Sequence, residues 1–284
     1  MCASLAAALL LLCEPSPQDQ QAALQAAYEE LLAVSPTPKG VAAEQAVWLE
    51  DLEGYVEPAD HADMIADRIE DLRSEAARDR RVRQVKVDHA GDLEKNCVEI
   101  DLKGCSVPAG GFVNDGDRRL YWQLQDGYTD DDGISARLVL LADSQAARYY
   151  LQPVVWASGG VTYDPPVVFG GGDGTPTYVA IPGRYMGTGN HNADLVFRWA
   201  EDGELVQVDN WSWRTTLDQK LPEGLGVWKG VDFNYPILFA HSPLWRADDG
   251  NCCPTGGEVF LDFAIEDDVL VVTSAHVREA GAED

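Results

Sequence analysis

The residues able to do nucleophilic chemistry are dispersed along the chain and match no catalytic pattern. Ser158 precedes two glycines but lacks the glycine two positions earlier that a nucleophile elbow requires. His191, His241 and His276 stand far apart, and their spacing selects no Ser or Cys as a triad partner. The glycine-rich stretch 169–175 lacks the Lys-Ser or Lys-Thr pair of a phosphate-binding loop. We therefore interpret the chain as a non-enzyme without a cofactor.

Neither calcium nor zinc is predicted. The run 130–133 (Asp-Asp-Asp-Gly) follows Tyr128, which stands where a calcium loop needs its first ligand, and no Glu occupies the last ligand position. This run predicts a solvated turn. The adjacent thiols of Cys252 and Cys253 lack the two-residue gap that lets both sulfurs face one zinc ion.

Four cysteines are candidates for disulfides. Cys97 and Cys105 flank a short run, and their spacing suits a local hairpin clasp in an oxidising compartment. Cys252 and Cys253 could bridge each other as a vicinal pair, or each could reach one of the earlier two. Four cysteines allow three pairings, and the sequence leaves the choice open.

The N-terminal segment 1–17 resembles an export signal. Ala3–Leu12 is ten apolar or small residues, too short to span a bilayer of ~30 Å but suited to the apolar core of a signal peptide. Cys13 directly follows four leucines, as in a bacterial lipoprotein signal, and is the lipidation candidate. We expect a periplasmic or secreted protein, with a lipid tether to the outer membrane through Cys13 as the alternative.

The chain is strongly acidic. Its 284 residues include 48 Asp and Glu against 21 Lys and Arg, a formal charge of −27. A cut at residue 90 leaves 17 acidic and 8 basic residues from Glu14 to the cut, and 31 and 13 after it. From this division we expect acidity throughout and no specialised acidic module. Such a field repels nucleic acids and anionic lipids and favours cationic partners.

The first part of the chain is predicted to be helical. Apolar residues recur near a period of 3.6 over Gln18–Val34, Gly40–Tyr55 and Pro58–Val82, with proline-containing breaks between them. Basic residues between Arg78 and Lys86 favour a helix C-terminus there. These features predict a small antiparallel helical domain over 18–88.

From residue 89 to 284 the pattern changes to alternation and frequent turns, which predicts a β domain. Two hairpins are the clearest, Asp194–Trp199 with Glu204–Trp213 and Glu258–Ile265 with Val269–His276. The fold class is therefore α+β, with a helical unit followed by a mostly antiparallel β-sandwich or barrel-like domain. Further strands are expected at Val98–Leu102, Leu120–Leu124, Ser135–Leu141, Arg148–Trp156, Pro166–Phe169 and Tyr178–Ile181.

The helical part resembles the N-terminal domain of the LprI-type lysozyme-inhibitor family. Ala23–Leu32 (ALQAAYEELL), Ala43–Tyr55 (AEQAVWLEDLEGY) and Ala62–Ser74 (ADMIADRIEDLRS) carry the resemblance, over about a quarter of the chain. It implies a secreted or periplasmic protein whose partner is a cationic hydrolase of the lysozyme kind. In the β part, Asp249–Gly257 (DGNCCPTGG) resembles a loop of uncharacterised secreted bacterial proteins, which implies location but no activity.

Two pairs of residues are candidates for binding. Trp48 and Arg68 could present an aromatic and a cation to a partner, or they could be a core residue and an intradomain ion-pair residue. Trp211 and Trp213 are two positions apart, so on a strand they share one face. On an exposed face they would stack on sugars, and on a buried face they would belong to the core.

Our leading hypothesis from sequence is a secreted or periplasmic binding protein that inhibits a lysozyme-like, cationic cell-wall hydrolase by occlusion. Two alternatives stay open. One is a β module that binds or hydrolyses cell-wall carbohydrate. The other is a structural envelope protein with no small ligand.

Overall fold

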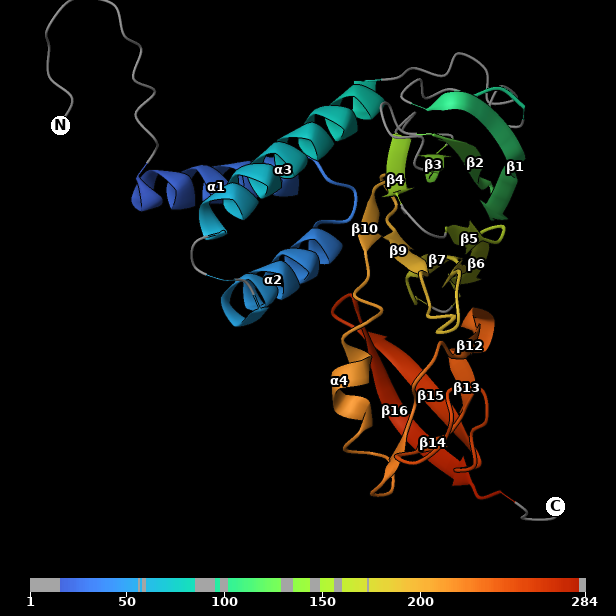
Figure 1. Cartoon of the computed structure of the whole chain (residues 1–284). Helices are drawn as coiled ribbons and strands as arrows, with labels where there is room; N and C mark the ends of the chain where they lie inside the picture. Colours follow the sequence, from blue (N-terminus) through green and yellow to red (C-terminus); the bar gives the residue numbers. More distant parts are fainter. Residues whose placement is uncertain are drawn as a thin grey trace, which may run out of the picture. The chain divides into compact units, whose positions relative to one another are not determined.

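The computed structural model describes residues 16–55, 57, 60–84, 95–97, 102–128, 135–143, 149–155, 160–172 and 174–280. The chain divides into two compact units (Figure 1). The helical unit contains Met1–Ser35 and Val41–Ala77, and the β-rich unit contains Pro36–Gly40 and Arg78–Asp284. Three N-terminal helices followed by antiparallel sheets confirm the predicted α+β class.

The helices are α1 (Pro17–Leu32), α2 (Pro38–Tyr55) and α3 (His61–Gln84), each within a few residues of its predicted range. Ser16 caps α1, since its hydroxyl accepts from the Asp19 amide while the Asp19 carboxylate accepts from the Ser16 amide. The core of the unit forms where one apolar face of each helix meets the others. It consists of Leu24, Ala27, Leu31, Val41, Leu72 and Ala76, with Trp48 among the partly buried residues packed against it.

Two open sheets pack face to face in the first part of the β-rich unit. One has the order β1-β2-β3-β4 and the other β10-β9-β7-β6, with a small β5-β8 pair beside them. Alternate residues of β2 and β3 meet residues of β7 and β9 in one apolar core, which makes this part sandwich-like. The strands are β1 (Lys103–Asp115), β2 (Arg118–Tyr128), β3 (Ser135–Asp143), β4 (Tyr149–Val155), β5 (Val161–Tyr163), β6 (Val167–Gly170), β7 (Thr177–Ile181), β8 (Gly183–Tyr185), β9 (Leu195–Trp199) and β10 (Leu205–Gln207).

Trp199 of one sheet joins an ion pair of the other sheet. Arg118, at the start of β2, lies 3.6 Å from the Asp143 carboxylate at the end of β3. Trp199, at the end of β9, donates its indole N–H to the same carboxylate at 2.6 Å. The Arg118 guanidinium also lies 4.1 Å from the centre of the Trp199 ring. Charge, hydrogen bond and stacking therefore meet at one point of the sandwich.

A third sheet, β12-β13-β15-β16, follows, with helix α4 (Trp213–Leu217) beside β16 (Figure 1). Its strands are β12 (Asp232–Asn234), β13 (Phe239–Pro243), β15 (Glu258–Glu266) and β16 (Val269–Arg278). The short strands β11 (Leu225–Gly226) and β14 (Trp245–Arg246) pair separately, and the 3-10 helix η2 (Tyr235–Ile237) links β12 to β13.

The hairpin predicted between residues 258 and 276 is confirmed as β15–β16. Its turn residues, Asp267 and Asp268, have φ of 50° and 59°. Positive φ at both central positions gives the primed two-residue turn that matches strand twist. Arg198 binds the Asp268 carboxylate at 2.6 and 2.8 Å, which fixes this turn against β9.

One strand prediction is wrong, and another lies mostly outside the described residues. The strand expected over Glu204–Trp213 ends at Gln207, because the Asp209 carboxylate accepts from the amides of Trp211 and Ser212 and turns the chain. Leu102 is not in a strand, and residues 98–101 of the same prediction lie outside the described residues. Instead the neighbouring β1, which contains Pro108, forms an edge strand with irregular register, where proline is tolerated.

Candidate functional site

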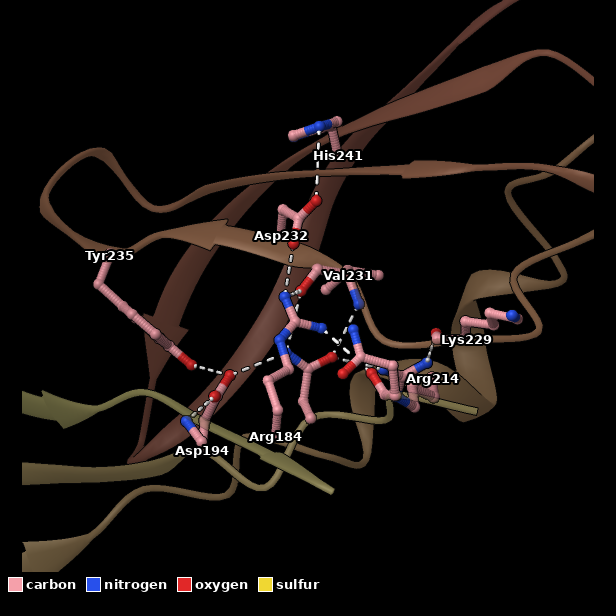
Figure 2. A network of polar contacts seen from close by, with 11 residues as sticks. Arg184, Asp194, Arg214, Lys229, Val231, Asp232, Tyr235 and His241 are labelled. Atoms are coloured by element: carbon pink, nitrogen blue, oxygen red, sulfur yellow. Dashed lines mark hydrogen bonds and ion pairs between the residues drawn. The ribbon is translucent and has the colours of Figure 1, made fainter. Parts of the chain in front are cut away.

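A buried carboxylate, that of Asp194, organises the polar network in Figure 2. It accepts hydrogen bonds from the Gly183 amide at 2.7 Å, the Tyr235 hydroxyl at 2.6 Å and the Asn192 side chain at 3.1 Å. Burial raises the pKa of Asp194, and these donors offset part of that rise. Burial also raises the pKa of Tyr235, so its hydroxyl keeps the proton that it donates.

The Asn192 side chain joins three segments. Its amide group donates to the Val231 carbonyl at 2.9 Å, and its oxygen accepts from the Val231 amide at 2.8 Å. The same oxygen accepts from Arg214 at 3.0 Å. The loop after β8, the segment before β12 and helix α4 are thereby held at one place.

The Arg184 guanidinium lies at the centre of the network (Figure 2). It donates to the Val231 carbonyl at 2.7 Å and to the Asp232 carboxylate at 2.6 Å. Asp232 in turn lies 3.7 Å from the His241 ring. A side chain at Gly230 would collide with Arg184, so only glycine allows this approach. Arg184 is thus committed to a structural role.

His191, Arg214 and Lys229 form what we call the cationic cluster. Arg214 lies 4.6 Å from the centre of the Trp213 ring and donates to the Lys229 carbonyl at 3.5 Å. Within the described parts of the chain, no carboxylate lies within ion-pair distance of any of its three side chains. Burial, and then the charges of Arg214 and Lys229, lower the pKa of His191. Burial is also the main cause that lowers the pKa of Arg214.

The two predicted binding residues of the helical unit, Trp48 and Arg68, lie close together and make their contacts within that unit. Arg68 donates to the Gln45 side chain at 3.0 Å and lies 3.8 Å from the Glu44 carboxylate. Its guanidinium is 5.7 Å from the centre of the Trp48 ring. Trp48 packs against the core, and only 14% of the Arg68 side chain is exposed. The intradomain interpretation fits this geometry.

The predicted pair Trp211 and Trp213 does not share a strand face. Trp213 begins α4 and is buried, with its ring edge-on to Phe233 and Phe263 and its N–H donated to the Asn210 carbonyl at 2.9 Å. Trp211 is half-buried in the preceding turn. The prediction of a common face is therefore wrong, because Asp209 ends the strand, and the two indoles form no sugar platform.

The predicted clasp between Cys97 and Cys105 is present as a disulfide, with Cα atoms 6.4 Å apart. Cys252 and Cys253 pair with each other, which selects the vicinal option among those the sequence left open. Cys13 lies outside the described residues.

The remaining candidates from the sequence are the nucleophile Ser158 and the aspartates that were considered for calcium. Ser158 and the aspartates 130–132 lie outside the described residues. In the part of the chain that the structure describes, no group of three His, Cys, Asp or Glu side chains is arranged to hold a metal ion. Within the same ranges, no helix is both long and apolar enough to cross a bilayer.

A groove runs between α1 and α2 in the helical unit. Its volume is about 160 Å³, and buried Leu24 and Gln45 contribute to its lining. Residues four positions apart lie on the same face of a helix. Glu29 therefore follows the lining residues Gln21 and Gln25 on α1, and Glu50 follows Ala42 and Ala46 on α2. We expect these two carboxylates to lie near the edges of the groove. The lining is Gln21, Leu24, Gln25, Tyr28, Ala42, Gln45, Ala46 and Leu49.

The charge is unevenly divided between the two compact units, contrary to the expectation from sequence. The helical unit has 15 acidic and 2 basic residues among 72, a net charge of −13. The β-rich unit has 33 and 19 among 212, a net charge of −14. The two units differ more in charge density than the two sides of residue 90 do, because the basic residues between Arg78 and Lys86 belong to the β-rich unit. The helical unit is thus a specialised acidic module.

Sequence reasoning did not single out Arg184, Asn192, Asp194, Arg214 or Tyr235. Their partners lie as many as 48 positions away, so no local spacing could have linked them. Comparison with protein-family models, curated proteins and solved structures finds no match for this chain.

Proposed function

We propose that this chain is a secreted or periplasmic binding protein whose helical unit captures a basic protein. The observation that carries the proposal is the excess of carboxylates on that unit. Twelve of its acidic residues are exposed, whereas one of its two basic residues, Arg68, is held by contacts within the unit. The resemblance to LprI-type inhibitors makes a cationic cell-wall hydrolase of the lysozyme kind the first partner to test.

The proposed mechanism is occlusion after electrostatic steering. A negative module accelerates encounter with a basic protein, and the attraction acts over a Debye length of ~8 Å at physiological salt. At contact, the groove between α1 and α2 offers the partly exposed Tyr28 and Leu49 to the aliphatic stem of a lysine or arginine. Carboxylates such as Glu29 and Glu50 would then pair with the charged head.

Two observations support a location outside the cytoplasm. The disulfide between Cys97 and Cys105 is typical of an oxidising compartment. The apolar run Ala3–Leu12 resembles a signal sequence, with Cys13 as the proposed site of a lipid tether. Sedimentation of tagged protein into periplasmic or membrane fractions, with and without Cys13→Ser, would test both parts of this proposal.

The activity is tested by adding the purified protein to a lysozyme-type hydrolase and following lysis of cell walls. We expect inhibition at micromolar concentration in low salt and weaker inhibition at moderate salt, because screening reduces steering. No inhibition at either salt would overturn the proposal. Retention of the protein on hydrolase-free peptidoglycan measures direct glycan binding, which would mimic inhibition by shielding the substrate.

Matched charge variants locate the surface. Glu29→Gln, Glu50→Gln and Glu53→Gln together remove three exposed charges from the helical unit. The control variant removes the same number from the β-rich unit, at the exposed residues Asp218, Glu223 and Glu266. We expect the first to weaken inhibition at low salt about tenfold or more and the second to change it little. Equal losses would point to net charge alone and exclude a docking surface on the helices.

A further inference from the structure

The cationic cluster is exceptional in a chain with a formal charge of −27. Five other arginines of the β-rich unit have carboxylate partners, in the pairs Arg118–Asp143, Arg137–Asp126, Arg184–Asp232, Arg198–Asp268 and Arg278–Glu258. Arg214 is half-buried as well, yet no carboxylate lies within ion-pair distance of it in the described ranges. A buried charge without a counter-charge is unfavourable, so its persistence needs an explanation.

Arg214 is the rigidly held member of the cluster. Arg214 is fixed by the Asn192 oxygen at 3.0 Å, by the Lys229 carbonyl at 3.5 Å and by the face of Trp213. It therefore lies between the loop that carries His191 and the segment that carries Lys229. The His191 carbonyl accepts from the Tyr185 amide at 2.9 Å, which holds that loop on β8. The Arg214 side chain therefore has few rotations left to lose when a ligand arrives.

The electrostatics agree with this geometry. Arg214 and Lys229 both lower the pKa of His191, so each of these two charges acts on the imidazole. The Asp194 carboxylate raises the pKa of Arg214 through space, whereas the positive charge of Arg184 lowers it. Asp194 already accepts three hydrogen bonds and lies beyond ion-pair distance of Arg214, so it is not a direct partner of the cluster.

We propose that His191, Arg214 and Lys229 bind a small oxyanion, of the carboxylate or phosphate class. The guanidinium provides paired donors that match two oxygens of such a group, and the lysine adds a mobile point charge. His191 adds a donor and, when protonated, a further charge. This site belongs to the β-rich unit and is independent of the proposed docking of a basic protein on the helices.

The direct test follows the imidazole signals of the full chain by NMR across pH. The chain has five histidines, and His191→Gln identifies the signal of interest. In sodium chloride we expect a His191 pKa below the ordinary 6.5. Sodium phosphate at equal ionic strength should raise it by about half a unit or more, because a nearby anion favours imidazolium. An unchanged pKa in both phosphate and acetate would overturn the proposal.

The two probes separate the possible sources of the oxyanion. A shift that needs less phosphate than acetate assigns a phosphate group, and the reverse order assigns a carboxylate. Either order supports the site, since both anions present oxygens to the same donors.

Two variants test the assignment to these residues. Lys229→Gln removes a charge whose side chain lies 6.0 Å from the centre of the Trp245 ring and makes no side-chain hydrogen bond in the described ranges. We expect it to weaken phosphate binding about three- to tenfold. Lys220→Gln removes the same charge from an exposed position in the same unit and should leave binding unchanged. Equal effects of the two variants would contradict a site at the cluster.

Discussion

The helical unit and the β-rich unit handle charge in opposite ways. In the helical unit the carboxylates stand in solvent, and the ion pair between Arg68 and Glu44 leaves 70% of the Glu44 side chain exposed. In the β-rich unit charged groups lie inside the structure. The Asp143 side chain is fully buried, and Asp194 is enclosed by its three donors.

This difference separates two uses of the same residue types. Exposed carboxylates contribute little to folding but create a field that acts at a distance. Buried ones act over a few ångströms and strongly penalise the loss of a partner. The helical unit is therefore suited to attracting a partner, whereas the β-rich unit is suited to holding defined side chains at fixed positions.

The largest expected effect comes from breaking the buried pair of the β-rich unit. Asp143→Ala leaves Arg118 without its buried partner and the Trp199 N–H without its acceptor. We expect a loss of about 3–5 kcal/mol in the free energy of unfolding, measured by urea denaturation with tryptophan fluorescence. Asp143→Asn keeps an acceptor for Trp199 and should lose less. A loss below about 1 kcal/mol for Asp143→Ala would show that the sandwich does not depend on this pair.

The next effect concerns the hydroxyl that binds Asp194. Tyr235→Phe removes a donor from a buried carboxylate, and we expect a loss of about 1–3 kcal/mol in unfolding free energy. Tyr178→Phe is the control, because that hydroxyl makes no hydrogen bond in the described ranges.

This loss should also depend on pH. Burial raises the folded pKa of Asp194 above its ordinary value of 3.8, so its contribution to stability falls as pH rises through 3.8 and levels off above the folded pKa. Without the Tyr235 donor that pKa rises further. The deficit of Tyr235→Phe should therefore be smaller near pH 4 than near pH 7, and a deficit that does not change with pH would contradict this account.

The sequence was sufficient where local pattern decides the structure. Apolar period and proline breaks placed α1, α2 and α3, and alternation around a short turn placed β15–β16. The prediction of a strand that includes Trp213 was wrong because one side chain, that of Asp209, turns the backbone before Trp213. No periodicity signals such an event.

The polar site was beyond prediction from sequence for a related reason. Its members come from the segments 183–194, 210–214 and 229–241, and only packing of β8, α4 and β12 brings them together. By contrast, an intradomain ion pair of Arg68 was one of the two predicted possibilities, because Arg68 stands on a predicted amphipathic helix, and Glu44 is its partner. The division of charge required the unit boundary at Ala77, which composition alone did not reveal.

A smaller effect should follow from screening of the helical unit. Its net charge of −13 among 72 residues is self-repelling, so added sodium chloride should stabilise it. Between about 20 and 500 mM salt, where the Debye length falls several-fold, we expect slower hydrogen exchange in α1–α3 and a smaller change in β2, β3 and β9. Equal changes in both units would mean that the salt acts through a general effect and not through the charge density of the helices.

The smallest effect is expected for the exposed ion pair of the helical unit. Glu44→Ala removes a carboxylate 3.8 Å from Arg68, but the pair is mostly in water and Arg68 keeps its hydrogen bond to Gln45 and its contact with Trp48. We expect a loss of no more than about 0.5 kcal/mol, measured by urea denaturation followed by circular dichroism, and less at high salt. The removal of one negative charge from a module of −13 also relieves repulsion, which offsets part of this loss. A loss comparable to that of Asp143→Ala would remove the contrast between the units, because it would mean that the helical unit also depends on a paired charge for its fold.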